Sequence, residues 1–379
     1  MPKYKFSEIA ENVTEKRMPT AEDKLLYIAP NNLDTDTLSV PEYGHKVDLK
    51  GVKLVMHAGD MLFGRREPQL KKAAIAPHDG LFSAHGMIFH PKENVITKEF
   101  FPFFISSDYF FDAAIRIAVG SLSPTINWRD LKDLEFTIPA IDTQKKYSEI
   151  LWSIITTKRA YIRLLQCTDA LVKAHFRELF GQETAGMDFL PLEKCCDRIT
   201  GGGTPSMKHP EYYGGSIPFI KSGDVKEHTV SQGALSLTET ALEQTTAKLL
   251  PAGTVVVVIR SAALRHEFHA AVTQVPLVIN QDLKALQVKA KFLPEYIMWA
   301  LISNEEKLLG GVQTVLTSHI EMRDLLNLPI AVVPIEKQQV FCEFVNQSDK
   351  STESLREALA KTNELQKMLV AEIFSGEEQ

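Results

Sequence analysis

The sequence predicts an α+β protein in which one unit, a mixed globular domain followed by a long helix, occurs twice. Three observations predict this fold. The chain has 379 residues, which is long enough for two domains that each bury a core. Its second half repeats motifs of its first half at a constant offset. Each half also ends in a stripe of apolar residues with helical spacing and without Gly or Pro.

The internal repeat is carried by short motifs that recur 194 positions later in the chain. Between these motifs the offset drifts by a few residues, as insertions in loops would produce. We infer a tandem duplication of a unit of about 190 residues. The matched motifs are Ala58–Asp60 with Ala252–Thr254, Ile126–Leu131 with Ile320–Leu325, and Ile141–Gln144 with Ile335–Gln338.

The first part of each unit is predicted to be rich in β-strands. Leu25–Ile28 and Ile217–Ile220 are short apolar runs followed by turn-forming residues. Thr254–Ile259 is a β-branched run, which is typical of a buried strand. Phe100–Phe111 and Pro294–Leu309 are predicted helices packed on these strands, because apolar residues recur there at spacings of three and four. The same spacing assigns the phenylalanines of the first helix to the core.

The second part of each unit is predicted to be a spacer helix, over 142–182 and over 336–379. Because the repeat relates the two helices, we expect them to pack on each other as an antiparallel coiled coil. A helix of about 36 residues is about 54 Å long, so it would separate the globular domains 1–141 and 183–335. The residues expected to mediate helix or subunit packing are Ile154, Tyr161, Leu164, Leu171, Leu355, Leu365 and Leu369.

Composition excludes several classes of protein. With a net charge of −6, 44% hydrophobic residues and 24% charged residues, the chain is neither disordered nor a uniformly basic coat for nucleic acid. The first residues lack the apolar core of an export signal, and no apolar stretch is long enough to cross a membrane. We therefore expect a cytoplasmic protein with reduced thiols, since no C-x-x-C spacing joins its cysteines, Cys167, Cys195, Cys196 and Cys342.

A family resemblance is carried by the start and the end of the second unit. Thr200–Ser206 and Pro210–Val225 resemble the opening of a target-recognition domain from a type I restriction-modification specificity subunit. Pro334–Gln339, together with the end of the same helix at Glu372–Gly376, resembles the spacer of that family. The resemblance covers essentially the whole chain, because the family repeats the same order of domain and helix. The first unit departs from it, with Ala10–Glu15 in place of the Gly-Gly-Thr-Pro-Ser opening.

The resemblance implies a non-catalytic subunit that reads a bipartite target in double-stranded DNA through two target-recognition domains. It implies that the spacer helices dock two methyltransferase subunits, which bring S-adenosylmethionine, and that restriction subunits using ATP and Mg join them. No cofactor is expected in this chain itself. Two alternatives stay open: a single-chain DNA-modifying enzyme such as a nuclease, and a coiled-coil scaffold that does not bind DNA.

The sequence contains no recognisable catalytic or metal-binding motif. It has no Pro-Pro-aromatic loop for a flipped adenine and no Gly-Lys-Ser/Thr phosphate loop. In His266–His269 the two histidines are three positions apart, and no third ligand follows at the spacing of a metalloprotease. We therefore predict no catalytic residue and no metal site.

Candidate DNA-binding residues lie in loops that follow predicted strands. Arg65 and Arg66 come after Phe63-Gly64, and Arg260 and Arg265 come after the corresponding strand of the second unit. Arginine can donate two hydrogen bonds to guanine or clamp a phosphate, so matched positions in two repeats favour DNA binding over a solvated surface loop. The glycines of 201–203 are expected to form a turn that positions the hydroxyls after them. The other candidates are Lys71, Lys72, Ser121, Ser123, Thr204, Ser206, Lys221, Ser222, Gln313 and Thr314.

Overall fold

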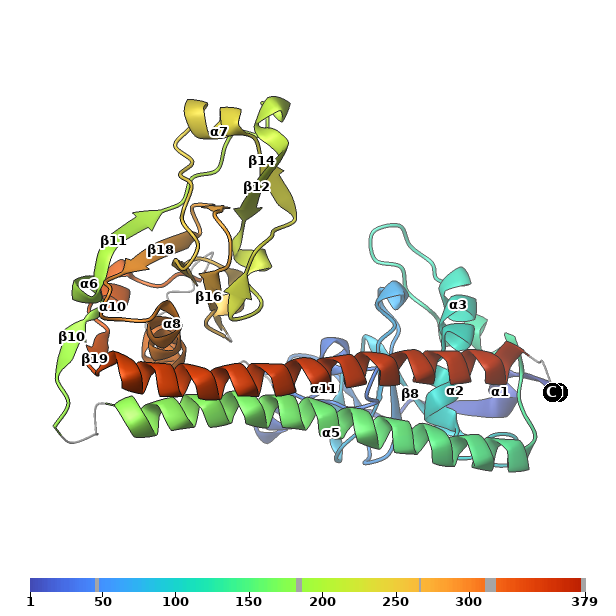
Figure 1. Cartoon of the computed structure of the whole chain (residues 1–379). Coiled ribbons are helices and arrows are strands. Elements are labelled where there is room, and N and C mark those ends of the chain that lie inside the picture. The colour runs from blue at the N-terminus through green and yellow to red at the C-terminus, as the bar shows by residue number, and fades with distance from the viewer. Residues whose placement is uncertain (45–47, 182–185, 266, 311–317, 376–379) are drawn as a thin grey trace. The chain divides into compact units, whose positions relative to one another are not determined.

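The computed structural model describes residues 1–44, 48–181, 186–265, 267–310 and 318–375, and it divides into two compact units (Figure 1). Unit 1 comprises Met1–Leu165 and Ser354–Gln379, and unit 2 comprises Gln166–Glu353. Both units mix helices with strands, which confirms the predicted mixed fold class. Within the described residues, no helix is both long enough and apolar enough to span a lipid bilayer.

Unit 1 is built on a sheet of four strands in the order β2-β8-β5-β6, with a second sheet in the order β3-β4-β7 and a small pair β1-β9. Its strands are β1 (Lys3–Lys5), β2 (Ala10–Val13), β3 (Lys16–Arg17), β4 (Lys53–Met56), β5 (Met61–Gly64), β6 (Ala73–Ile75), β7 (Gly80–Phe82), β8 (Gly86–Pro91) and β9 (Glu135–Thr137). Its helices are α1 (Phe6–Ile9), α2 (Phe101–Ser106), α3 (Asp108–Arg116) and α4 (Trp128–Leu131), followed by the start of α5 (Ile141–Phe180).

Unit 2 has sheets in the orders β11-β18-β15-β16-β13 and β14-β12-β17, and a small pair β10-β19. Its strands are β10 (Phe189–Pro191), β11 (Cys196–Gly201), β12 (Tyr213–Ile220), β13 (Thr229–Val230), β14 (Leu235–Leu237), β15 (Val255–Val258), β16 (Ala270–Thr273), β17 (Val278–Ile279), β18 (Leu283–Val288) and β19 (Pro329–Ala331). Its helices are α6 (Leu192–Cys195), α7 (Glu239–Gln244), α8 (Pro294–Ser303), α9 (Glu305–Gly310) and α10 (Met322–Leu326), followed by the start of α11 (Ile335–Ser375).

The two units repeat each other in detail. The order β2-β8-β5-β6 in unit 1 matches β11-β18-β15-β16 in unit 2. A fully buried glutamine near the start of each long helix, Gln144 or Gln338, makes the same three hydrogen bonds to backbone. The side-chain oxygen accepts from Thr97 N (2.7 Å) or Leu293 N (2.8 Å). The amide nitrogen of Gln144 donates to Val95 O (2.9 Å) and Pro139 O (2.8 Å). The amide nitrogen of Gln338 donates to Lys291 O and Val333 O, both at 2.9 Å.

Most predicted elements are present, with three changes. The predicted helix Pro294–Leu309 is divided into α8 and α9 at Asn304, whose side-chain amide donates to Ala300 O at 2.9 Å. The predicted helix Phe100–Phe111 is divided into α2 and α3 at Ser107, whose hydroxyl accepts from Phe110 N at 3.1 Å as an N-cap, and its phenylalanines are buried as predicted. The predicted strand Leu25–Ile28 is wrong, because only Ile28 pairs, in an isolated bridge with Phe82. The Asp23 carboxylate accepts from Thr20 N and pairs with Arg17, both at 2.6 Å, and these contacts stabilise a turn there instead.

The two long helices begin within one residue of the predicted positions, but three of the residues predicted to mediate helix or subunit packing are exposed. Leu164, Leu171 and Leu365 are 50%, 58% and 55% exposed. The buried line of α5 lies one position away, through Leu151, Ile155, Lys158, Val172 and Phe176. Ile154 is buried, Leu369 packs against the core of unit 1, and Tyr161 and Leu355 are half-buried.

Each unit contains a segment of both long helices packed together. In unit 1, Lys158 Nζ of α5 donates to Gln366 Oε1 of α11 at 2.8 Å, and Lys158 is only 2% exposed. In unit 2, Phe176 of α5 packs edge-on against Phe341 of α11, with 5.2 Å between ring centroids. The pair of Lys158 with Gln366 explains why the predicted residues differ from the buried ones. A pattern of leucines does not indicate that a lysine occupies a buried position of α5.

Candidate nucleic-acid interface

In unit 2, loops from several strands converge on the turn between β17 and β18. Strands β12 and β17 are parallel neighbours, with Ile220 opposite Ile279, so the chain leaves both at the same edge. The backbone N–H of Asn280 donates to Ile220 O at 2.9 Å, which brings the turn next to Lys221 and Ser222. After β15, Arg260 N donates to Asp282 O at 3.2 Å. Lys221, Ser222 and Arg260 therefore lie around the turn Asn280–Asp282.

The glycine loop after β11 packs on the same turn. A Cβ at Gly202 would lie 2.1 Å from Asn280 O, so only glycine fits this approach of the two backbones. Gly203 N donates to Ile279 O at 3.2 Å, and the next residue, Thr204, hydrogen-bonds through its hydroxyl to the Gln281 side chain. This geometry gives the glycines the positioning role predicted for them. Ser206 is exposed, and its hydroxyl accepts from Lys208 N at 3.3 Å.

Asp282 is the acidic centre of this arrangement. Its carboxylate accepts from Asn280 Nδ2 at 2.9 Å and lies 3.8 Å from Arg260 Nη1. The Arg260 side chain is 55% exposed, so its guanidinium can reach a ligand from this position. Arg265 Nε donates to Ser318 Oγ at 3.2 Å. The candidates Gln313 and Thr314 lie outside the described residues.

Unit 1 contains the same turn with a different side chain in the place of Asp282. Ser83 occupies the position of Asn280 and His85 that of Asp282, because the turns share three hydrogen bonds. In unit 1 these run from Ser83 N to Ile28 O (3.0 Å), from Gly86 N to Ser83 O (3.0 Å) and from His85 N to Ser83 Oγ (3.2 Å). In unit 2 they run from Asn280 N to Ile220 O (2.9 Å), from Leu283 N to Asn280 O (3.3 Å) and from Asp282 N to Asn280 Oδ1 (3.2 Å).

Arg65 and Arg66 lie beside this turn as Arg260 lies beside the other. Gly64 pairs with Gly86, so the residues that flank them, Arg65 and His85, leave the ladder together. Arg66 forms a β-bridge with Thr125, and Arg260 forms the corresponding bridge with His319. Burial and the charges of Arg66, Arg65 and Lys53 lower the pKa of His85. Among the described residues Arg66 has no ion pair, so this edge of unit 1 is positive.

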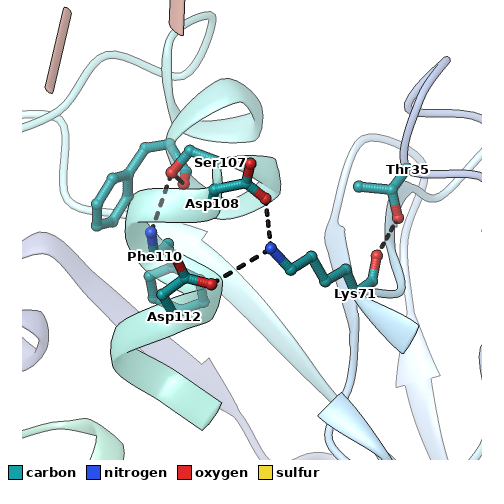
Figure 2. A network of polar contacts seen from close by, with 7 residues as sticks. Thr35, Lys71, Ser107, Asp108, Phe110 and Asp112 are labelled. Atoms are coloured by element: carbon teal, nitrogen blue, oxygen red, sulfur yellow. Dashed lines mark hydrogen bonds and ion pairs between the residues drawn. The ribbon is translucent and has the colours of Figure 1, made fainter. Parts of the chain in front are cut away.

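Lys71 and Lys72 belong to a separate network inside unit 1. Figure 2 shows the Lys71 ammonium directed at two carboxylates of α3, Asp108 and Asp112, the second at 3.3 Å. Burial alone would lower the pKa of Lys71, but these carboxylates outweigh it and raise that pKa. Lys72 Nζ donates to Leu33 O at 3.0 Å. The structure thus shows both lysines in contacts within the unit, and their predicted role in DNA binding stays a prediction.

Ser121 and Ser123 lie on an exposed loop that continues from the arginine edge. The loop is joined to that edge by the bridge of Arg66 with Thr125 and by the hydrogen bond from Glu67 N to Pro124 O, 2.8 Å. Both serines are exposed. The structure thus brings Arg65, Arg66, Ser121 and Ser123 together in unit 1. Lys72 is their neighbour through its backbone, since Gly64 N donates to Lys72 O at 2.8 Å, but its ammonium is directed to Leu33 O.

Sequence reasoning missed the turn residues themselves, His85 in unit 1 and Asn280–Asp282 in unit 2. A signal was available, because the two turns lie 197 positions apart, close to the offset of the repeat. Within the described ranges, no group of three His, Cys, Asp or Glu side chains is arranged to hold a metal ion. His266 of the rejected metal motif lies outside those ranges.

Known proteins resemble this chain in sequence over part of its length. The family profile of the type I restriction modification DNA specificity domain matches residues 195–366. The EcoR124I/EcoR124II specificity subunit of Escherichia coli is 32% identical over 168 residues, 44% of this chain and 42% of that protein. The MjaIX specificity subunit of Methanocaldococcus jannaschii is 26% identical over 185 residues, 47% of this chain and 40% of that protein. The chain spans about two fifths of the length of these curated relatives.

Two solved structures share the fold over nearly the whole chain. One is a chain of a type I R-M system studied for complex assembly and conformational transition, with a TM-score of 0.57, 17% identity, and coverage of 99% of this chain and 97% of that chain. The other is the type I restriction-modification system S subunit from M. genitalium, with a TM-score of 0.53, 11% identity, and coverage of 100% and 96%. At these identities the likeness concerns the fold.

Proposed function

We propose that this chain, whose residues 195–366 match a type I restriction modification DNA specificity domain, is the recognition subunit of such a system and reads a bipartite DNA target. The observation that carries the proposal is the repeated edge described above. Each unit presents an arginine, Arg66 or Arg260, beside a turn of the same hydrogen-bonded geometry. Two related edges with different side chains are what two unlike half-sites require.

The chemistry of these edges suits double-stranded DNA. Arginine can donate two hydrogen bonds to guanine O6 and N7, and amide side chains such as those of Asn280 and Gln281 can pair with adenine N6 and N7. Hydroxyls such as that of Thr204, and Lys221 beside it, are suited to phosphate oxygens. Since the net charge is −6, binding by the chain alone is expected to be weak and strongly dependent on salt.

We propose further that the long helices bind two methyltransferase subunits, with restriction subunits joining the assembly, in the cytoplasm. The half-exposed side chains of Leu164, Leu171 and Leu365 support this role, because leucines exposed on a long helix offer apolar area to a partner. S-adenosylmethionine, ATP and Mg would be held by those partners. The chain itself would be non-catalytic.

The adenine-methylation pattern in cells that express this chain with its neighbouring methyltransferase tests the proposal. We expect two short unlike sequences separated by a fixed gap. Arg66→Ala should relax one half-site and Arg260→Ala the other, with assembly intact, whereas Lys208→Ala serves as an exposed control. One contiguous methylated block would contradict the proposal, and DNA cleavage or methylation by the purified chain alone would favour a single-chain enzyme.

Leu365→Asp tests the partner surface separately. Because Leu365 is 55% exposed, the substitution should leave the helices folded but abolish co-purification of the methyltransferase for any DNA target. A variant that retains its methyltransferase would indicate a different docking face. A chain that binds no DNA even with its partner present would support the scaffold alternative.

A further inference from the structure

An apolar side chain is exposed at the tip of the loop beside the arginines of unit 1. Leu122 is 97% exposed, more than any other large hydrophobic residue of the described chain. It stands between two exposed serines, Ser121 and Ser123. A leucine in this position covers nothing within its own unit, so its apolar surface is available to a ligand.

The loop is held in shape by its own hydrogen bonds. Val119 and Thr125 exchange two backbone hydrogen bonds, of 3.1 and 2.9 Å, that close its base. The Thr125 hydroxyl donates to Ser123 O at 3.2 Å. Gly120 has φ of +114°, a backbone conformation that favours glycine. Leu122 is therefore presented on a closed loop whose ordering costs little on binding.

The base of the loop is joined directly to the cationic edge. Ile126 N donates to Arg65 O at 2.9 Å, and Thr125 bridges to Arg66. Positive charge beside an apolar tip is the combination used by proteins that insert a side chain between base pairs, in which cations bind the flanking phosphates while Leu, Ile, Phe or Met opens the step. Leu122, together with the 64% exposed Val119 at the base of the loop, offers too little apolar area for a stable protein interface.

We propose that Leu122 is a wedge that inserts between two adjacent base pairs at the half-site bound by unit 1. The proposal rests on the DNA-recognition function proposed above. The inserted leucine unstacks one step and bends the duplex, and Ser121 and Ser123 reach the phosphates on either side. Pyrimidine–purine steps are the easiest to unstack, so the wedge selects for such a step without any hydrogen bond to a base edge.

The test uses the assembled methyltransferase complex and duplex DNA that carries the methylated motif with 2-aminopurine placed at one position at a time. For the wild type we expect a rise in 2-aminopurine fluorescence at one step of one half-site. Leu122→Ala should abolish that rise and weaken binding about tenfold, with an unchanged dependence on salt, because an apolar contact rather than a charge is lost. Leu122→Met should restore both, and Leu25→Ala, at a leucine 67% exposed elsewhere in unit 1, should change neither.

The outcomes separate this inference from the proposed function. A wild-type complex that binds its bipartite target but shows no fluorescence rise at any position would overturn the wedge and leave DNA recognition standing. So would a Leu122→Ala complex with full affinity and an undiminished rise, or a loss of methyltransferase binding by that variant in the absence of DNA. A complex without specific binding to any DNA would refute the proposed function itself.

Discussion

The turn beside the arginines is the same in the two units, but the charge that it places there differs. In unit 1 the turn presents His85 to Arg65 and Arg66, and in unit 2 it presents Asp282 to Arg260. Backbone hydrogen bonds hold both turns, with the side chain at the first position, Ser83 or Asn280, accepting from the backbone N–H at the third. The hydrogen bonds shared by the two turns do not use the side chain at the third position, so that side chain can differ between units and set the charge beside the arginines.

The two units also differ in how they hold cations of α5. Lys158 in unit 1 donates to neutral oxygens, Asp36 O at 2.6 Å and Gln366 Oε1 at 2.8 Å, and burial lowers its pKa. Lys173 in unit 2 pairs with the Glu305 carboxylate at 2.7 Å, and although burial opposes it, this contact raises the pKa of Lys173. Along α5, unit 2 therefore holds its cation through a carboxylate and unit 1 through neutral oxygens.

Alkaline pH should separate the two units by the largest margin. All four cysteines lie in unit 2, and burial raises the pKa of Cys195 to about 11 and those of Cys196 and Cys342 to about 12, from 9.0. Because the folded pKa values are raised, the stability that these thiols contribute is present below pH 9 and is lost as the pH rises toward 11 to 12. In that window each of the three thiols should lower the free energy of unfolding of unit 2 by about 1.4 kcal/mol per pH unit. At pH 10, one unit above 9.0, the three together should lower it by about 4 kcal/mol.

Thiol labelling as a function of pH measures this effect, since it reports only on unit 2. The exposed Cys167 should react at every pH, whereas Cys195 and Cys196 should become reactive at a lower denaturant concentration at pH 10 than at pH 8. Fluorescence of single-tryptophan variants that keep Trp128 or Trp152 follows unit 1. Equal alkaline sensitivity of the two units would break the comparison.

Substitution of the buried glutamine should lower the free energy of unfolding by the same amount in both units. Gln144→Ala and Gln338→Ala each leave three backbone groups without their partners, so each should lower the free energy of unfolding by about 3 kcal/mol. The neighbouring Gln339 is exposed, and Gln339→Ala is the matched control, with a change of about 0.5 kcal/mol or less. Urea titration measures all three, and a loss confined to one variant would show that the repeated hydrogen bonds are not energetically equivalent.

How far the sequence predicts these features depends on whether they are local. The long helices are predictable because their apolar spacing persists along segments of 40 and 41 residues, and the matched positions of Arg66 and Arg260 follow from the repeat. The packing line was misplaced because Lys158 and Gln366 satisfy each other across two helices, a pairing that neither segment indicates alone. The turns of His85 and Asp282 were missed because their place beside the arginines depends on strand pairing between distant segments.

Exchanging the third residues of the two turns, His85 and Asp282, should exchange the charge that each turn places beside its arginines. Asp282→His removes the carboxylate beside Arg260, so binding to the half-site of unit 2 should strengthen about fivefold at low salt, and His85→Asp should weaken the other half-site by a similar factor. Asp282→Asn is the control that removes charge while keeping an amide oxygen for Asn280. Titration of the assembled complex with DNA altered in one half-site at a time measures each effect, and equal changes at both half-sites would contradict the assignment of one turn to each.

The smallest expected effect is a pH dependence confined to unit 1. The pKa of His85 lies below its usual 6.5, because the site is buried and Arg66, Arg65 and Lys53 repel a further positive charge. Bound phosphates would offset that repulsion, so DNA binding should draw a proton to His85 as the pH falls below 6.5, and affinity for the half-site of unit 1 should rise two- to threefold between pH 7 and pH 5.5.

The free protein behaves in the opposite way: its lowered pKa means that the unfolded chain binds more protons, so His85 reduces stability over the same range. Affinity must therefore be measured with excess folded complex. As the pH falls from 7 to 5.5, the slope of log affinity against log salt concentration should steepen by less than one released ion in the wild type. The slope should stay unchanged in His85→Asn. An equal pH response in the His85→Asn complex would assign the titration to another group and remove the histidine from the comparison of the two turns.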